Sequence, residues 1–202
     1  MYIPKANEMN DTHEIVNFMK RFGFATIISV QDNIPVATHL PFTVTEKDDE
    51  IKLYSHFAKA NSQWKNIEAN KVLIIFSEPH AYISPNNYDQ FLSVPTWNYI
   101  AVHVYGKVKI IEEQNNVLNI VETAIDNYET SYKNQWNQLP QEFKEKMLKG
   151  IVAFEINITE IQAKKKLSQN KTKQEQERII DTLSKSFNSN EKLIAEYMNK
   201  AL

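Results

Sequence analysis

Side chains able to bind a small polar ligand gather in five short segments of this 202-residue chain. Each segment places hydroxyl, amide, imidazole or lysine groups beside aromatic rings or short apolar stretches. The segments are 37–42 (ATHLPF), 55–64 (SHFAKANSQW), 81–88 (AYISPNNY), 94–99 (VPTWNY) and 166–170 (KLSQN). Rings provide flat apolar walls, whereas amides, hydroxyls and lysines provide hydrogen bonds and charge. This mixture is suited to holding a flat molecule with polar edges.

A flavin nucleotide is a ligand of this kind. Its ring packs against aromatic or aliphatic walls, its edge needs donors and acceptors, and its phosphate needs a cation or a helix N-terminus. Segment 55–64 supplies several of these groups together, because Lys59, Asn61 and Ser62 lie at the start of an expected helix that carries Trp64. The competing interpretation is that the rings pack the core, and the residues alone leave both interpretations open.

Other familiar motifs are absent from the sequence. With three glycines the chain has neither a GxGxxG turn nor a P-loop, and no HExxH or GxSxG occurs. The five histidines are scattered, and His103 is best explained as a hydrogen-bonded core or interface residue. The absence of cysteine excludes disulfides, thiolate metal sites and a cysteine nucleophile. We therefore predict no metal site, and no dedicated acid–base pair is visible.

The charge balance bears on nucleic-acid binding. The net charge is −2, whereas proteins that bind duplex DNA usually present a basic face. One basic cluster exists, formed by Lys164, Lys165, Lys166, Lys171 and Lys173. Most such runs are solvated surface stretches, so DNA binding is expected only if a dimer displays this segment twice. The sequence has no apolar run of transmembrane length and no leader peptide at its start, which favours a cytoplasmic protein.

Strands and helices must position the five segments. Runs rich in β-branched and alternating apolar residues predict about seven strands, at 24–30, 34–46, 51–56, 72–76, 81–83, 96–111 and 151–161. Caps and helical periodicity predict helices at 11–22, 61–70, 114–133, 141–148 and within 172–202. In strand 96–111 the alternation places Trp97, Tyr99 and His103 on one face and Asn98 on the other.

Two features favour an antiparallel sheet over a parallel α/β arrangement. The opening strands are joined by short polar turns near 31–33 and 47–50, which only antiparallel neighbours can use. The strands are also unequal in length. The expected fold class is therefore mainly β with helical additions (α+β), built on an antiparallel barrel of six or seven strands.

Longer strings around the five segments carry a family resemblance. They are HLPF (39–42), SHFAKANSQW (55–64), VLIIFSEPHAYISP (72–85), VPTWNYIAVHVYGKV (94–108) and KLSQNK (166–171). In this order and spacing they resemble the PaiB-like family of FMN-binding negative transcriptional regulators. The resemblance runs from Met1 to about Lys171, and the combination of PTWNY with KLSQN is its most specific part. It implies an FMN-binding split-barrel domain at 1–171, with 172–202 as a C-terminal helical extension.

The resemblance also implies a fold, a cofactor and an assembly. The fold would be an antiparallel split β-barrel of the pyridoxamine-oxidase-like FMN-binding type, paired as a homodimer that holds FMN in a groove between its subunits. The residues implied near the phosphate and ribityl chain are His56, Lys59, Asn61, Ser62 and Trp64. Those implied beside the ring, at the dimer seam or as pocket walls are Tyr82, Ser84, Trp97, Asn98 and Tyr99. Those implied to close the pocket, from the same or the partner subunit, are Lys166, Ser168, Gln169 and Asn170.

The chain departs from the family pattern at three places. Relatives often have glycine before the proline of Ser77-Glu78-Pro79 and tryptophan near Asn87-Tyr88, which weakens 86–88 as a specific contact. Relatives often have arginine where this chain has Lys59. A lysine still offers a phosphate a positive charge, but as a point rather than a planar fork.

Three functional interpretations remain open from the sequence. The first is an FMN-binding dimer that represses genes directly or through a partner. The second is an FMN-dependent oxidoreductase, in which His39, His56 or Tyr99 donates a proton. The third is a haem-binding protein of the same barrel class, with His80 or His103 as axial ligand. The family resemblance favours the first, whereas the residues themselves support only the cofactor.

Overall fold

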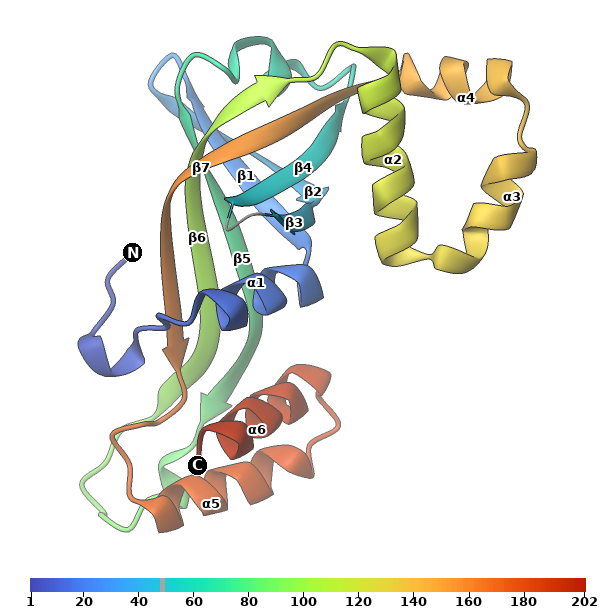
Figure 1. The fold of residues 1–202 in the computed structure, drawn as a ribbon. Coiled ribbons are helices and arrows are strands. Elements are labelled where there is room, and N and C mark those ends of the chain that lie inside the picture. Colours follow the sequence, from blue (N-terminus) through green and yellow to red (C-terminus); the bar gives the residue numbers. More distant parts are fainter. Residues whose placement is uncertain (48–49) are drawn as a thin grey trace. The chain divides into compact units, whose positions relative to one another are not determined.

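The fold is α+β, with one seven-stranded sheet and helices around it (Figure 1). The computed structural model describes residues 1–47 and 50–202. The strands are β1 (Phe24–Gln31), β2 (Ile34–Pro41), β3 (Thr43–Lys47), β4 (Glu50–Ala58), β5 (Lys71–Ile83), β6 (Thr96–Ile110) and β7 (Ile151–Lys166). Their order in the sheet is β2-β1-β5-β6-β7-β4-β3, so β2 and β3 are the two edges and the sheet is open.

The described residues form six α-helices and four short 3₁₀ helices. The α-helices are α1 (Thr12–Arg21), α2 (Gln114–Tyr128), α3 (Lys133–Gln138), α4 (Gln141–Leu148), α5 (Lys173–Ser184) and α6 (Ser189–Ala201). The 3₁₀ helices are η1 (Lys5–Asn7), η2 (Ser62–Asn66), η3 (Pro85–Asn87) and η4 (Thr130–Tyr132). None of the described helices is long and apolar enough to cross a membrane.

The chain divides into two compact units. We call residues 16–76 and 103–161 the sheet unit, and residues 1–15, 77–102 and 162–202 the terminal unit. Strands β5, β6 and β7 each contribute one segment to each unit. The strands β1 to β4 and the helices α2 to α4 belong wholly to the sheet unit, whereas α5 and α6 belong wholly to the terminal unit.

Short turns set the antiparallel pairing of the sheet unit. β1 and β2 pair from Phe24 with Pro41 to Gln31 with Ile34, across a turn in which Asp32 and Asn33 both have positive φ. Two left-handed residues match the twist of a two-residue hairpin, and Asp and Asn tolerate this conformation well. β1 also pairs with β5, β3 with β4, and β4 with β7, all antiparallel.

Aromatic rings fill the core of the sheet unit. The Phe57 and Phe154 rings stack with centroids 5.0 Å apart, and Phe42 makes edge contacts with Phe76 and Phe154. All four side chains are at most 2% exposed. Gly106 lies where β6 passes close to β7, because a Cβ atom there would come within 2.4 Å of the Ile156 side chain. One of the three glycines is thus required by strand packing.

Three helices form an insertion between β6 and β7 (Figure 1). Val117 of α2, Leu148 of α4 and Ala153 of β7 form a small buried cluster that holds the insertion to the sheet. At the end of α2 the Tyr128 hydroxyl donates to the Phe42 carbonyl at 3.1 Å. Trp136 of α3 is buried, and its indole N–H donates to Glu122 at 3.0 Å.

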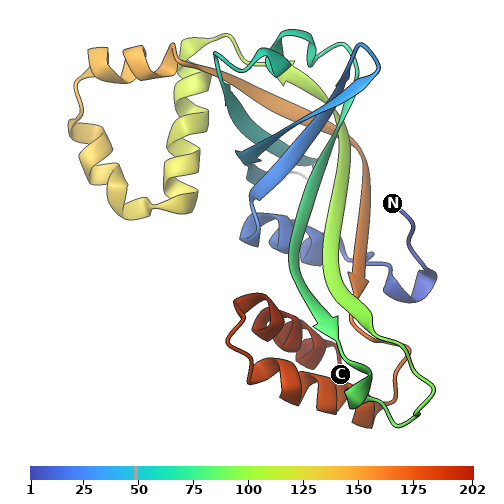
Figure 2. The ribbon, with the colours of Figure 1, turned by 180° about the vertical axis from the view of Figure 1, so that it is seen from behind.

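Helices α5 and α6 form an antiparallel pair in the terminal unit (Figure 2). Thr172 and Glu175 form a reciprocal capping box that starts α5, and the Asn188 side chain caps α6. Ile179 and Leu183 of α5 and Ile194 and Met198 of α6 are the main buried apolar side chains of the pair. The helices predicted within 172–202 are confirmed.

Most predicted elements are present, with several boundaries moved. The strand expected at 34–46 is two strands, because the chain breaks at Pro41-Phe42. The runs 72–76 and 81–83 are one strand, β5, which continues through a cis Glu78–Pro79 bond. The helix expected at 61–70 is only the 3₁₀ helix η2, and the side chain of Asn61, which was expected at the helix start, caps it. The helix expected at 114–133 ends at Tyr128.

Candidate functional site

The polar segment after β4 is fixed to the sheet unit through its backbone. The Lys59 amide donates to the Gly150 carbonyl at 2.8 Å, and the Trp64 indole N–H donates to the Lys59 carbonyl at 3.0 Å. We call residues 59–66 the Lys59 loop. These contacts set the path of the loop and leave the Lys59 ammonium without a hydrogen bond or ion pair among the described residues.

A buried glutamine anchors the Lys59 loop to the β1–β2 hairpin. Gln63 is 1% exposed, and its side-chain amide donates to the Ser29 hydroxyl at 3.0 Å and to the Val36 carbonyl at 3.1 Å. Its side-chain oxygen accepts from the Thr38 hydroxyl at 2.6 Å. The Asn61 side-chain amide donates to the same Thr38 hydroxyl at 3.0 Å. The Asn61 side-chain oxygen accepts from the backbone amide of Gln63 at 2.9 Å. Asn61 and Gln63 are thus used in shaping the loop.

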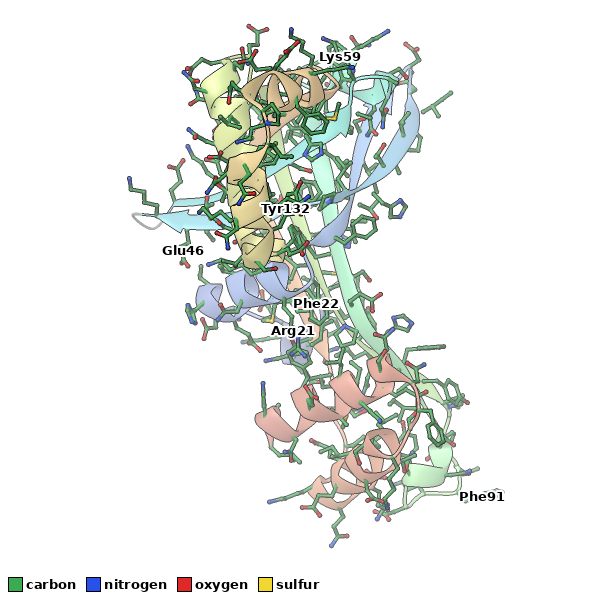
Figure 3. The ribbon with its side chains drawn as sticks, turned by 90° about the vertical axis from the view of Figure 1, so that its right-hand side faces the viewer. Arg21, Phe22, Glu46, Lys59, Phe91 and Tyr132 are labelled. Atoms are coloured by element: carbon green, nitrogen blue, oxygen red, sulfur yellow. The ribbon has the colours of Figure 1, made fainter. Side chains whose placement is uncertain are left out.

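A pocket of about 320 Å³ lies beside the Lys59 loop. Its lining residues are Lys59, Trp64, Ile110, Ile111, Glu112, Gln114, Val117, Glu145, Leu148, Lys149, Ile151, Val152 and Ala153. Figure 3 labels Lys59 at this end of the sheet unit, where α4 also lies. The pocket therefore combines two predicted site residues, Lys59 and Trp64, with apolar side chains from β6, β7, α2 and α4.

Two further predicted residues are His56, which precedes the Lys59 loop, and Ser62, which lies within it. His56 is half-buried on β4, opposite Ala153 of β7, and burial lowers the pKa of its imidazole. A neutral imidazole is therefore favoured near neutral pH. Ser62 is exposed at the start of η2, so its hydroxyl is available to solvent or a ligand.

The aromatic residues of the terminal unit form a second, exposed group. Trp97 of β6 is 52% exposed and Tyr82 of β5 is 47% exposed. Their ring centroids are 5.8 Å apart, and the His80 ring lies 6.0 Å from that of Trp97. The faces predicted for strand 96–111 are confirmed, since Asn98, Ile100 and the alternate residues after them are buried. Trp97 thus offers its indole to solvent and does not pack in a core.

The KLSQN turn of the terminal unit has a buried side and an exposed side. Ser168 is 4% exposed, has a φ of 61°, and donates its hydroxyl to the Asn98 amide oxygen at 3.1 Å. Asn98 is fully buried and also contacts the sulfur of Met198 at 3.4 Å. Gln169 and Asn170 are exposed. The Gln169 side chain nevertheless accepts from the Leu167 backbone amide at 2.7 Å and donates to the Lys165 carbonyl. Asn98, Ser168 and Gln169 therefore shape the turn, whereas Asn170 faces solvent.

The basic run at the end of β7 and in the turn that follows it is largely paired within the terminal unit. Lys164 is 7% exposed, with its ammonium 5.0 Å from the Tyr99 ring centroid and 5.7 Å from that of Tyr2. Lys165 forms an ion pair with Glu14 at 2.6 Å, and Lys166 donates to the Thr96 hydroxyl. The Lys171 ammonium lies 3.5 Å from the Tyr88 ring centroid. Four of the five lysines therefore have internal partners.

The last predicted residue, Ser84, helps to shape the loop between β5 and β6. Its hydroxyl accepts from the Asn86 amide at 3.2 Å, and it caps η3. Glu175 of α5 holds the following part of the loop, because its carboxylate accepts from the backbone amides of Asp89 and Thr172, each at 3.0 Å. These hydrogen bonds lower the pKa of Glu175.

Two of these positioning residues escaped the sequence analysis. Gln63 gave no signal, because a glutamine in a polar segment looks the same whether it is buried or exposed. Glu175 could have been found, because Thr172-x-x-Glu175 is the sequence pattern of a capping box. The structure brings five of the predicted site residues together in the sheet unit and the other nine in the terminal unit. No group of three or more potential metal ligands occurs among the described residues.

Comparison with known proteins identifies the family. Residues 1–160 match the family model described as "Putative FMN-binding domain". Protease synthase and sporulation protein PAI 2 of Bacillus subtilis is 40% identical over 205 residues, which cover 100% of this chain and 98% of that protein.

Solved structures support the fold. The flavocytochrome Anf3 of Azotobacter vinelandii gives a TM-score of 0.64 at 13% identity, over 82% of this chain and 72% of that one. The FAD and haem binding protein of Mycobacterium smegmatis gives 0.62 at 12% identity, over 79% and 73%. At such identities the likeness concerns the fold alone, which is the expected split β-barrel with a sheet that is not closed. The chain belongs to the PaiB-like FMN-binding family, and its cofactor is FMN.

Proposed function

We propose that this protein is a cytoplasmic homodimer that binds FMN and acts as a negative regulator of gene expression. The observation that carries the proposal is the Lys59 loop, which presents an exposed ammonium and an indole at a pocket in a chain of the FMN-binding family. The regulatory part rests on the family and on the full-length match to a protease synthase and sporulation protein.

The donor groups of the Lys59 loop fit the phosphate end of FMN. Lys59 provides a positive charge, Ser62 an exposed hydroxyl, and Trp64 an indole whose N–H is already held by the loop backbone. A charge-assisted hydrogen bond from lysine is a common means of binding phosphate. Asn61 and His56 complete the proposed set, Asn61 by shaping the loop and His56 as a neutral neighbour on β4.

The terminal unit fits the ring end of the same cofactor. Trp97 and Tyr82 are exposed aromatic walls, and Tyr99, Ser84, Lys166, Gln169 and Asn170 lie in the same unit. Asn98 and Ser168 hydrogen-bond to each other in the same unit. We propose that the terminal unit of one subunit faces the Lys59 loop of its partner, so that each flavin contacts both copies. Three more exposed apolar residues of this unit, Phe91, Leu92 and Val94, favour an interface there; Figure 3 labels Phe91.

The pairing of the basic run bears on how regulation occurs. Duplex binding relies on lysines and arginines that are free to neutralise phosphates. Since Lys164, Lys165, Lys166 and Lys171 have internal partners, this segment offers little free positive charge. We therefore propose that the protein regulates through a partner protein and not by direct contact of this segment with DNA.

Calorimetric titration with FMN tests the cofactor site. Lys59→Ala should weaken FMN binding by about 1–3 kcal/mol, the range for losing a hydrogen bond to a charged group. Lys65→Ala is the matched control, because Lys65 is exposed on η2 and does not line the pocket. Equal affinities of the wild type and Lys59→Ala would remove Lys59 from the phosphate site.

Expression profiling tests the regulatory role. A strain lacking the gene should overexpress a set of transcripts, and wild-type protein but not Lys59→Ala should restore repression. Light scattering on the purified protein should give the mass of a dimer. Sustained FMN-dependent consumption of NAD(P)H with an acceptor, together with unchanged transcripts, would instead favour the oxidoreductase interpretation. A salt-sensitive mobility shift with DNA would contradict regulation through a partner protein.

A further inference from the structure

A second cavity of the sheet unit contains none of the residues assigned above to FMN. It has a volume of about 740 Å³ and lies between α2 and the face of β3, β4, β6 and β7. The residues that line it are Thr43, Thr45, Lys47, Glu50, Lys52, Tyr54, Lys109, Ile111, Asn116, Asn119, Ile120, Thr123 and Glu155. We call it the α2 cleft. Pockets for metabolite-sized ligands have volumes of about 300–1,000 Å³, so the α2 cleft is of suitable size.

Strand register explains the polar floor of the α2 cleft. Thr43 pairs with Tyr54 and Tyr54 with Glu155, so these three side chains form one row across the sheet. Thr45 pairs with Lys52 in the next row. Residues two apart on a strand share a face, so the rows lie side by side. The floor therefore presents hydroxyls, a phenol and charged groups where a sheet beneath a helix usually presents apolar side chains.

The roof of the α2 cleft is also polar. Asn116, Asn119 and Thr123 have the i, i+3, i+7 spacing of one helical stripe, and Ile120 completes it. The neighbouring apolar residues of α2, including Val117, hold the helix to the sheet. The Asn116 amide donates to Glu113, and the Thr123 hydroxyl donates to the Asn119 carbonyl at 2.7 Å. Two polar stripes thus face each other across an open space, while separate apolar contacts support the helix.

The charges of the α2 cleft favour an anionic ligand. Three of its lining residues are lysines and two are glutamates. The ion pairs Lys52–Glu50 and Lys109–Glu155 are each 3.6 Å long, which exceeds the usual length of a charge-assisted hydrogen bond. The ammonium groups therefore retain donors that a ligand phosphate or carboxylate can accept. The hydroxyls and amides of the other lining residues suit the hydroxyls of a polyol.

From these observations we propose that the α2 cleft is a second ligand site, separate from the FMN site, for an anionic polyol such as a sugar phosphate or a sugar acid. Lys52 and Lys109 bind the anionic group, and Asn119 and Thr45 hydrogen-bond to the hydroxyl chain. Such a site would let a metabolite bind to the protein while the flavin is in place.

Calorimetry on FMN-saturated protein tests the proposal, with D-ribose 5-phosphate and D-gluconate as separate probes. At least one probe should bind, and Lys52→Gln and Lys109→Gln should each weaken it by about 10- to 100-fold. Lys107→Gln is the matched control, since Lys107 is exposed on β6 and does not line the cleft. Asn119→Leu, an exposed position on α2, should also weaken binding and guards against a lysine variant that fails to fold.

Three results would overturn the proposal. They are no binding of either probe, binding that Lys52→Gln, Lys109→Gln and Asn119→Leu leave unchanged, and displacement of the probe by additional FMN. The FMN affinity of each variant is measured in the same series, and Lys59→Ala should lower it without affecting the probe. A failure of the α2 cleft and a failure of the FMN site therefore give different results.

Discussion

Two segments of this molecule carry lysines at or just after the end of a β-strand, and the structure uses these lysines in opposite ways. The Lys59 loop of the sheet unit is held by its backbone and by the buried side chain of Gln63, so the Lys59 ammonium is left exposed. The run from Lys164 to Lys171 in the terminal unit is held in part by its lysines, which contact Tyr99, Glu14, Thr96 and Tyr88.

This difference shows that the number of lysines in a segment is not a measure of the positive charge that the segment offers to a ligand. A lysine that packs over a ring or pairs with a carboxylate contributes to folding, and its charge is already neutralised or screened from a ligand. A single lysine on a loop held by other groups is available for binding. The less basic segment is thus the better candidate for recognising a phosphate.

Removal of Gln63 should have the largest effect. Gln63→Leu removes the donor to the Ser29 hydroxyl and the Val36 carbonyl and the acceptor of the Thr38 hydroxyl. The free energy of unfolding should therefore fall by about 2–4 kcal/mol in urea titrations. Gln135→Leu, at an exposed position of α3, is the control. A stability equal to that of the wild type would mean that the backbone contacts alone hold the Lys59 loop.

Substitution of a buried lysine and of an exposed lysine by alanine should have different effects on stability. Lys164→Ala removes a buried ammonium that lies over two rings and should reduce stability by about 1–2 kcal/mol. Lys59→Ala should change stability by less than about 0.5 kcal/mol, as is usual for exposed sites, while weakening FMN binding. Thermal unfolding of both variants measures the contrast. Equal losses of stability in the two variants would contradict the view that Lys164 supports the fold and Lys59 does not.

The terminal unit should show an acid dependence that comes from Glu175. Its pKa is lowered in the folded state by the hydrogen bonds from Asp89 and Thr172, so its contribution is complete above the ordinary glutamate pKa of about 4.3. That contribution is lost as the pH falls through the lower folded-state pKa. Glu175→Gln should therefore unfold with a shallower pH dependence between about pH 3 and 5. Parallel pH profiles for the two proteins would contradict this assignment.

The smallest expected effect is the pH dependence of stability that comes from His56 in the sheet unit. Burial lowers the pKa of its imidazole, so protonation opposes folding and stability falls as the pH drops below the ordinary histidine value of about 6.5. A proton NMR titration should place the His56 midpoint lower in the folded protein than in urea. Coinciding midpoints would show that β4 does not shield this side chain.

Local patterns predicted much of this molecule. The alternation in strand 96–111 gave the correct faces, and Asn61 caps η2 because its residue type suits that role. The break at Pro41-Phe42 and the continuity of β5 depend on pairing between distant strands, which a local pattern does not contain. The partners of the lysine run could not be predicted from local sequence either, because Glu14 and Tyr88 lie far from it along the chain.

The three tryptophans of the chain occupy three different settings, and this gives the protein built-in fluorescent reporters. Trp64 lies at the Lys59 loop, Trp97 is exposed in the terminal unit, and Trp136 is buried in the helical insertion. Flavin absorbs light at the wavelengths where indole emits, so a bound flavin quenches nearby indoles by energy transfer. Variants that keep one tryptophan at a time would therefore show separately how the cofactor lies relative to each of the two units.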